Sequence, residues 1–279
     1  MIRLISIFVG LGFAGVALIS LAFGAYAYAT DEPVAHLPYK KPEKVDFSFN
    51  GPFGKWDYGQ LQRGYKVYKE VCAACHGIKF VSFRDLADLG YTEAQVKAEA
   101  ASWTVPGIDP DTGEATTRPG LPTDPFPEPY PNNVAAAAAN NNAIPPDLSL
   151  MTKARNDGSN YVASLLAGYQ DEPDPEVLAE FPEAAPGPGL YHNPYFKNLN
   201  LAMSPPIAID DQVAYDDGTK ATVRQMSEDV AAFLTWTAEP SLIKRKQTGW
   251  PVMIFLLFAT VLAYLSKQQI WSAVKPKKD

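Results

Sequence analysis

The segment Cys72-Ala73-Ala74-Cys75-His76 decides how the rest of this sequence is interpreted. It has the C-x-x-C-H spacing of covalent c-type haem attachment. Two thiols three positions apart can reach the two vinyl groups of one porphyrin edge, and the next residue offers an imidazole to the iron. We therefore expect one haem c, bound through Cys72 and Cys75, with His76 as its first axial ligand.

Two other chemistries use closely spaced cysteines. A structural zinc site needs about four ligands, and this chain has no further cysteine and only His36 and His192 as other histidines. A thioredoxin-like dithiol is typical of a βαβ setting, which the sequence does not indicate. Export of the chain favours haem too, because c-type haem is attached outside the cytoplasm.

The second axial ligand decides what such a haem does. Histidine and methionine together close both axial positions and favour an electron carrier, whereas an open position favours ligand binding or oxygen chemistry. Met203 is the preferred candidate, because it precedes Ser204-Pro205-Pro206 in a non-helical segment that prolines stiffen. Met151 is a weaker candidate, as are His36 and His192.

Both ends of the chain are apolar. Residues 4–23 follow Arg3 and lead into small residues up to position 29, which predicts a signal peptide over 1–29, or an uncleaved N-terminal anchor. Residues 250–265 form a second apolar run with cations on both sides, which predicts a C-terminal transmembrane helix; a buried core helix is the alternative.

These segments predict three parts. Residues 30–243 form an exported domain, and residues 244–279 form the transmembrane anchor with a short cytoplasmic tail. Since cations near a membrane span prefer the cytoplasmic side, Arg3 predicts that the domain lies in the periplasm of a bacterial inner membrane.

The composition sets broad limits on function. With 24 Lys and Arg against 31 Asp and Glu among 279 residues, the net charge is −7, which argues against a nucleic-acid partner. Hydrophobic residues make up 47% of the chain, which excludes wholesale disorder. An acidic, proline-rich run over 171–188 can steer a basic protein toward the domain.

Helical spacing and capping residues predict a mostly α fold with long loops. Asp57 caps a helix to about Val71, and capping boxes at Thr92 with Gln95 and Thr222 with Gln225 start two more. Further helices are predicted over 82–89 and 160–169. Eight prolines between positions 104 and 131 predict no regular element there, and no strand pattern is comparably strong.

Several separate segments carry a resemblance to a known family. They lie at residues 71–76, 130–132, 140–148, 193–196, 203–206, 216–219 and 238–240. From residue 53 to about 278 the chain resembles the cytochrome c1 family, the haem subunits of ubiquinol:cytochrome c oxidoreductase. The resemblance implies a cytochrome c fold on one C-terminal transmembrane helix, with His76 and Met203 as axial ligands.

The resemblance also implies roles for other residues. Asn140, Pro145 and Pro146 would line the haem pocket, and Arg155 and Tyr161 would approach a haem propionate. The chain departs from the family at Arg155-Asn156-Asp157-Gly158, where paired glycines are more usual, and it lacks the extra cysteine pair and insertions of some bacterial members.

The implied function is electron relay. The haem would accept electrons from the Rieske iron-sulfur protein and pass them to a soluble or tethered cytochrome c, in a dimeric complex that includes cytochrome b. The isolated chain would then not be an enzyme. A free-standing, membrane-anchored cytochrome c that donates to a terminal oxidase or reaction centre is the alternative, and a haem peroxidase is a third.

Overall fold

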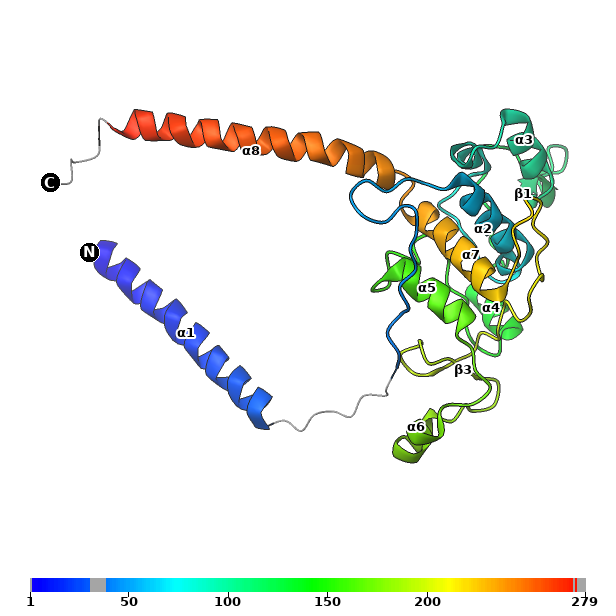
Figure 1. Ribbon diagram of the computed structural model, residues 1–279, viewed down its shortest axis with the longest axis horizontal. Helices are drawn as coiled ribbons and strands as arrows, with labels where there is room; N and C mark the ends of the chain where they lie inside the picture. Colours follow the sequence, from blue (N-terminus) through cyan, green and yellow to red (C-terminus); the bar gives the residue numbers. More distant parts are fainter. Residues whose placement is uncertain (1, 31–38, 273, 275–279) are drawn as a thin grey trace. The chain divides into compact units, whose positions relative to one another are not determined.

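The computed structural model describes residues 2–30, 39–272 and 274 (Figure 1). They belong to two compact units, residues 1–37 and 38–279. In the first unit, the described residues form the apolar helix α1 (Ile2–Thr30). The second unit contains every other element and the whole hydrophobic core.

The core is built on two crossing helices, α2 (Tyr58–Glu70) and α7 (Val223–Ala238). Gly64 makes the crossing possible, because a Cβ at this position would overlap the Asp229 carbonyl oxygen of α7. Helix α5 (Gly158–Ala167) packs on α7 from another side, and Figure 1 shows the three helices together. Absence of a side chain at one position thus sets how closely the two main helices approach.

Large aromatic side chains fill the space beside the crossing. Tyr65 and Tyr68 of α2 lie 5.6 and 5.8 Å, between ring centroids, from Phe233 of α7. Phe126 lies against both tyrosines, and Trp236 stacks on Phe233. All five are at most 3% exposed, so this aromatic group dominates the apolar area that stabilises the fold.

Short elements connect these helices. They are η1 (Cys72–Ala74), η2 (Phe83–Leu89), α3 (Glu93–Ala101), β1 (Thr104–Ile108), β2 (Ala115–Pro119), α4 (Asn133–Ala139), α6 (Pro175–Glu180), η3 (Pro182–Ala184), β3 (Tyr191–His192) and β4 (Asn200–Leu201). The strands pair as two antiparallel two-stranded sheets, β1 with β2 and β3 with β4. The described chain is therefore mostly helical, as the sequence predicts.

The prediction that residues 104–131 contain no regular element is wrong. Strands β1 and β2 form a hairpin, with Pro106 opposite Thr117 and Thr104 opposite Pro119. A two-stranded ribbon has only edge strands, where a proline can turn its missing N–H outward. The turn of the hairpin uses residue types that favour turns. The Asp109 side chain accepts hydrogen bonds from the N–H groups of two following residues, and Gly113 adopts a φ of 73°.

Other predicted boundaries need smaller corrections. Residues 83–89 form a 3-10 helix, α5 begins at Gly158, and α4 was not predicted. The acidic run contains α6 and η3, both of which begin with a proline at the first helical turn. The predicted capping box of Thr92 and Gln95 is confirmed. At α7 the Thr222 side chain accepts from the Gln225 N–H, but the Gln225 side chain donates to Asp229, so the second capping box is incomplete.

Two helices are long and apolar enough to cross a membrane. The predicted fold included only the C-terminal one, so this part of the prediction needs correction. The two helices are α1, with mean hydropathy 2.4, and α8 (Leu242–Ser272), with mean hydropathy 1.9; neither apolar window buries any residue in the described chain. Residues 250–265 are therefore not a core helix of this domain. The base of α8 is tied to the domain, because Lys246 Nζ donates to the carbonyl oxygens of Phe49 and Gly51 at 2.7 and 2.8 Å.

Candidate haem-binding site

The C-x-x-C-H segment follows α2 directly and forms one tight turn. The backbone N–H groups of Cys75 and His76 both donate to the Cys72 carbonyl oxygen, at 3.1 and 2.9 Å. From α2, the Tyr68 hydroxyl donates to the His76 carbonyl oxygen at 3.1 Å. The end of a core helix thus fixes the positions of both cysteines and the histidine.

Both thiols are free, since neither cysteine is in a disulfide. Cys72 is 8% exposed and belongs to the hydrophobic core, and burial raises the pKa of its thiol to about 12. Cys75 is half-buried, and its sulfur accepts a hydrogen bond from the Tyr130 hydroxyl at 3.7 Å. Two free thiols on one turn have the chemistry that thioether attachment requires.

The His76 ring is oriented by a backbone carbonyl. Its Nδ1 lies 2.7 Å from the Pro146 oxygen. Since a carbonyl only accepts, Nδ1 carries the proton and the Nε2 lone pair is left for a metal. Burial lowers the pKa of His76, which favours the neutral, ligating imidazole. Pro146, predicted to line the pocket, thus directly contacts a predicted ligand.

The loop around Pro145 and Pro146 is bonded along its length to the residues after His76. Leu148 N–H donates to the Gly77 oxygen at 2.8 Å, and the side chains of Asp147 and Ser149 accept from the N–H groups of residues 79 and 80. This loop and the C-x-x-C-H turn therefore form one structural unit.

Asn140 lies at the end of α4, close to this loop in the sequence. Its side-chain Nδ2 donates to the Ala136 carbonyl oxygen at 2.7 Å, so Asn140 caps its own helix. The next two residues, Asn141 and Asn142, have φ of 50° and 63°, and Asn141 Nδ2 donates to Gly189 at 3.3 Å. Asparagine tolerates this left-handed backbone, which turns the chain back toward Pro145.

Met203 is half-buried and packs against the same hydrophobic cluster that contains Cys72. Its carbonyl oxygen accepts a hydrogen bond from the Tyr169 hydroxyl at 3.0 Å. Over residues 2–30, 39–272 and 274, no hydrogen bond joins Met203 to the C-x-x-C-H turn, and both belong to or pack on the same large hydrophobic cluster. A neutral thioether at this cluster suits a soft axial ligand.

The weaker ligand candidates occupy other places. Met151 packs on the same cluster, two residues beyond the loop that is bonded to the turn. His192 lies on β3, where it is 3% exposed, and burial lowers the pKa of its ring. His36 lies outside the described residues.

Arg155 and Tyr161, the predicted propionate contacts, are neighbours. Arg155 is exposed and donates to the Ala154 oxygen at 3.0 Å. Burial raises the pKa of Tyr161, and the Arg155 guanidinium opposes that rise. Between them, Asp157 adopts φ 53°, and a Cβ at Gly158 would overlap the Thr152 carbonyl oxygen. Asp157 thus adopts a left-handed backbone that glycine would take freely.

The competing site chemistries find little support. Within the described residues, no group of three or more His, Cys, Asp and Glu side chains is arranged to hold a metal ion. The cysteines lie in a 3-10 turn after a helix, and the described sheets are antiparallel pairs, so the thioredoxin-like setting is absent from this part of the chain. The donor set of two thiols, one oriented imidazole and one thioether fits a covalently bound haem.

Sequence reasoning assigned no role at the site to three tyrosines that contact it. They are Tyr68 on the His76 carbonyl, Tyr130 on the Cys75 sulfur and Tyr169 on the Met203 carbonyl. The first two lie in segments that the sequence does single out, a helix face and a family-like Tyr-Pro-Asn. Tyr169 follows α5 and offers no motif, so only the tertiary structure identifies it.

Comparisons with known proteins identify the family of the chain. The Cytochrome C1 family matches residues 47–274. Cytochrome c1 of Rhodospirillum rubrum is 43% identical over 263 residues, which cover 91% of this chain and 94% of that protein. "Cytochrome c1, heme protein, mitochondrial" of Saccharomyces cerevisiae is 43% identical over 232 residues, 83% of this chain and 72% of the relative.

A longer relative is also similar. "Cytochrome b/c1" of Bradyrhizobium diazoefficiens is 44% identical over 278 residues, and the match covers 94% of this chain. The same match spans only 40% of that protein.

Proposed function

The chain belongs to the cytochrome c1 family, the haem electron-transfer subunits of the cytochrome bc1 complex, and we propose that it binds one covalent haem c and relays single electrons in such a complex. The observation that carries this proposal is the His76 imidazole, whose Nδ1 is bonded to the Pro146 oxygen, while two free thiols precede it on the same turn. Bound haem supplies an iron that changes reversibly between ferric and ferrous states.

The chain's own residues hold and tune that group. Cys72 and Cys75 would hold the haem covalently, and His76 and Met203 would bind its iron. Asn140, Pro145 and Pro146 shape the pocket wall around the His76 side. Arg155, with Tyr161 beside it, is the cation that pairs with a haem propionate. With His76 and Met203 both bound to it, the iron would exchange electrons without taking up a substrate.

The electron path needs partners. The haem accepts its electron from the Rieske iron-sulfur protein and passes it to a soluble or tethered cytochrome c, in a dimeric complex with cytochrome b. Quinol oxidation takes place on those other subunits, so this chain alone is not an enzyme. The name of the Bradyrhizobium relative, of which this chain matches 40%, supports the association with a cytochrome b.

The apolar helices support a membrane-anchored arrangement. Residues 30–243 form the periplasmic domain, residues 244–279 the anchor of a bacterial inner membrane with its cytoplasmic tail, and residues 1–29 a signal peptide or second anchor. At the domain end of α8, Arg245 pairs with Glu239 and Lys246 is bonded to two carbonyl oxygens of the domain.

An acidic lobe offers a surface for the acceptor. It comprises Asp171, Glu172, Asp174, Glu176, Glu180 and Glu183, all of them exposed. Helix α6, which contains two of them, buries none of its residues. Converting Glu176 and Glu180 to lysine should lower the rate of electron transfer to a basic cytochrome c at low salt and flatten its salt dependence. The same changes should leave the rate at high salt close to wild type.

The deciding experiment follows the c-haem α-band by stopped flow. A ubiquinol analogue is added to gently solubilised membranes that contain a tagged copy of the full chain, with and without an inhibitor of quinol oxidation. Fast, inhibitor-sensitive reduction supports the relay in a quinol:cytochrome c reductase. A haem that dithionite reduces but quinol does not, in an intact preparation, would instead favour the free-standing carrier.

A further inference from the structure

The segment that contains Met203 is anchored at its two ends. Before it, β4 pairs with β3, with Leu201 opposite Tyr191. After it, the Gln212 side chain donates to the Pro206 carbonyl oxygen at 2.7 Å and accepts from the Ala208 N–H at 2.9 Å. Among the described residues, the hydrogen bond to the segment between these anchors comes from the Tyr169 hydroxyl, which reaches the Met203 carbonyl oxygen at 3.0 Å.

Tyr169 follows directly from a firmly held helix. Residues Val162, Ala163 and Leu166 of α5 are buried, and the Ser159 hydroxyl lies 2.8 Å from that of Thr235 on α7.

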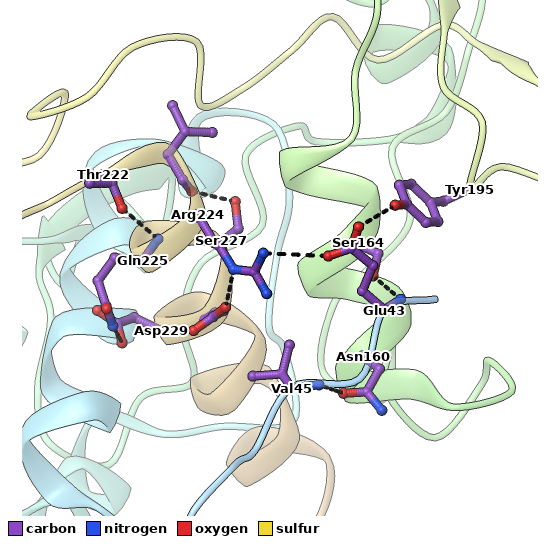
Figure 2. Close-up of polar contacts among 12 residues, drawn as sticks. Glu43, Val45, Asn160, Ser164, Tyr195, Thr222, Arg224, Gln225, Ser227 and Asp229 are labelled. Atoms are coloured by element: carbon purple, nitrogen blue, oxygen red, sulfur yellow. Dashed lines mark hydrogen bonds and ion pairs between the residues drawn. The ribbon is translucent and has the colours of Figure 1, made fainter. Parts of the chain in front are cut away.

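Helix α5 is also held by the chain segment before α2, which lies between α5 and α7 in Figure 2. There the Ser164 hydroxyl accepts from the Glu43 N–H at 2.9 Å and the Asn160 side chain accepts from the Val45 N–H at 3.0 Å. The Tyr195 hydroxyl and the Arg224 guanidinium both donate to the Glu43 carboxylate, at 2.9 and 3.4 Å. Helix α5 is thus a fixed platform for the residue that follows it.

We propose that Tyr169 is a positioning residue, whose hydroxyl holds the Met203 backbone so that the thioether stays on the haem iron. This inference rests on the proposed function, because it takes Met203 as the axial ligand. A thioether is a neutral, soft ligand on a flexible side chain, so the position of its backbone decides how often it leaves the metal. The platform, the tyrosine and the proposed ligand form a single line of contacts from α7 to Met203.

The test compares two tyrosines that differ in what their hydroxyls contact. Tyr169→Phe removes the bond to Met203 and keeps the ring. Tyr195→Phe removes a hydroxyl that binds Glu43, in the segment bonded to α5, and it controls for general loosening. Both are made in the full chain in membranes, and Met203→Leu gives the spectrum of a haem without the thioether.

Two readouts report on the ligand rather than on activity. The ferric protein's far-red thioether-to-iron charge-transfer band is followed as the pH is raised, and carbon monoxide binding is measured on the ferrous protein. Loss of one neutral hydrogen bond changes an equilibrium by up to roughly tenfold. For Tyr169→Phe we therefore expect the band to disappear at a pH about one unit lower, and carbon monoxide to bind up to about ten times faster. Tyr195→Phe should match wild type in both.

The outcomes separate this inference from the proposed function. A wild-type protein without the band, which binds carbon monoxide freely, would overturn Met203 ligation and the inference with it. A normal wild-type band that Tyr169→Phe leaves unchanged, or that Tyr195→Phe shifts equally, would overturn the inference alone. If Tyr169→Phe does not accumulate, fluorotyrosine incorporated at position 169 alone keeps the ring and strengthens the protonated hydroxyl as a donor. At a pH where that hydroxyl is protonated, carbon monoxide should then bind more slowly than to wild type, and an unchanged rate would contradict the proposal.

Discussion

The two proposed sides of the haem are held in very different ways. On the His76 side, the turn is bonded to α2 through Tyr68 and to the Pro146 loop through the imidazole and the Leu148 N–H. On the other side, within the described part of the chain, Met203 has one hydrogen bond, from Tyr169, between anchors that lie several residues away. Several independent hydrogen bonds therefore hold the His76 side, whereas the Met203 side depends on few contacts.

This difference follows from how each side is built. The C-x-x-C-H turn continues a core helix, so local backbone bonds and the aromatic core position it together. The Met203 segment lies between a two-residue ladder and two prolines, with no helix of its own. Local unfolding begins where buried contacts and hydrogen bonds are few. We thus expect changes on the Met203 side to alter the iron's ligands while the haem stays attached.

The largest effect should come from the covalent bonds. Replacing Cys75 by alanine removes one of the two thioethers and the acceptor of the Tyr130 hydroxyl. We expect nearly complete loss of holoprotein, measured as haem that stays with the chain on a denaturing gel. Ala74→Ser, at an exposed position in the same turn, is the matched control and should retain full haem staining. Normal staining in Cys75→Ala would refute two-point attachment.

Met203→Leu should separate the two sides. The side chain keeps its apolar volume but loses the sulfur, so the haem should remain attached through the cysteines and His76. The midpoint potential should fall by on the order of tenths of a volt, within the ~0.8 V range that axial ligands control. Redox titration measures the fall. An unchanged potential would direct attention to Met151, which packs on the same cluster.

A smaller but general effect is expected at the helix crossing on the His76 side. Gly64→Ala places a Cβ against the Asp229 carbonyl oxygen, which forces α2 and α7 apart. Overpacking of this kind costs about 1 to 3 kcal/mol, which corresponds to a fall of roughly 5 °C in the melting temperature of a domain this size. Gly59→Ala, on the open face of α2, is the control and should be neutral or slightly stabilising. Thermal unfolding in detergent measures both.

The same contrast explains how much of the fold the sequence could predict. The spacing of apolar residues and the capping side chains at Asp57, Thr92 and Thr222 predicted α2, α3 and α7, whose ends the structure sets within a residue or two. The hairpin of β1 and β2 was not predicted, because the many prolines of this segment argue against strands and the turn at Asp109 is a weaker signal. Helix α4 escaped it because alanine-rich residues carry no apolar periodicity.

The site divides in the same way. The C-x-x-C-H spacing is local, so the sequence alone predicts the turn and the free thiols. The contacts of His76 with Pro146 and of Met203 with Tyr169 join residues 70 and 34 positions apart, and no spacing rule predicts such pairs. The resemblance to a family placed Pro146 at the haem pocket, whereas the contact of Tyr169 with Met203 is known only from the structure.

The smallest effect is expected from a change at Glu99, which tests whether the remaining contacts of the His76 side hold the turn when one contact is lost. Glu99 joins α2 to α3, because its carboxylate accepts from the Tyr65 hydroxyl at 2.6 Å and the Trp103 ring N–H at 2.9 Å and pairs with Lys69 at 2.6 Å. Burial alone would raise the pKa of Glu99, but these donors outweigh it and lower the pKa below 4.5. The stabilisation is thus present above the ordinary glutamate pKa and is lost as the pH falls through the lowered folded-state pKa.

Glu99→Gln should therefore lower stability by only about 1 kcal/mol at neutral pH, after allowance for solvent screening, and should make stability depend less on pH on the acid side. Denaturant unfolding between neutral pH and pH about 3 measures this slope. Glu93→Gln, which removes an exposed carboxylate paired with Lys97, is the matched control and should change little. Because the remaining contacts of α2 still hold the turn, the haem spectrum should not change. A loss of the far-red band in Glu99→Gln would mean that the two sides are coupled, and that the His76 side is less securely held than its many contacts indicate.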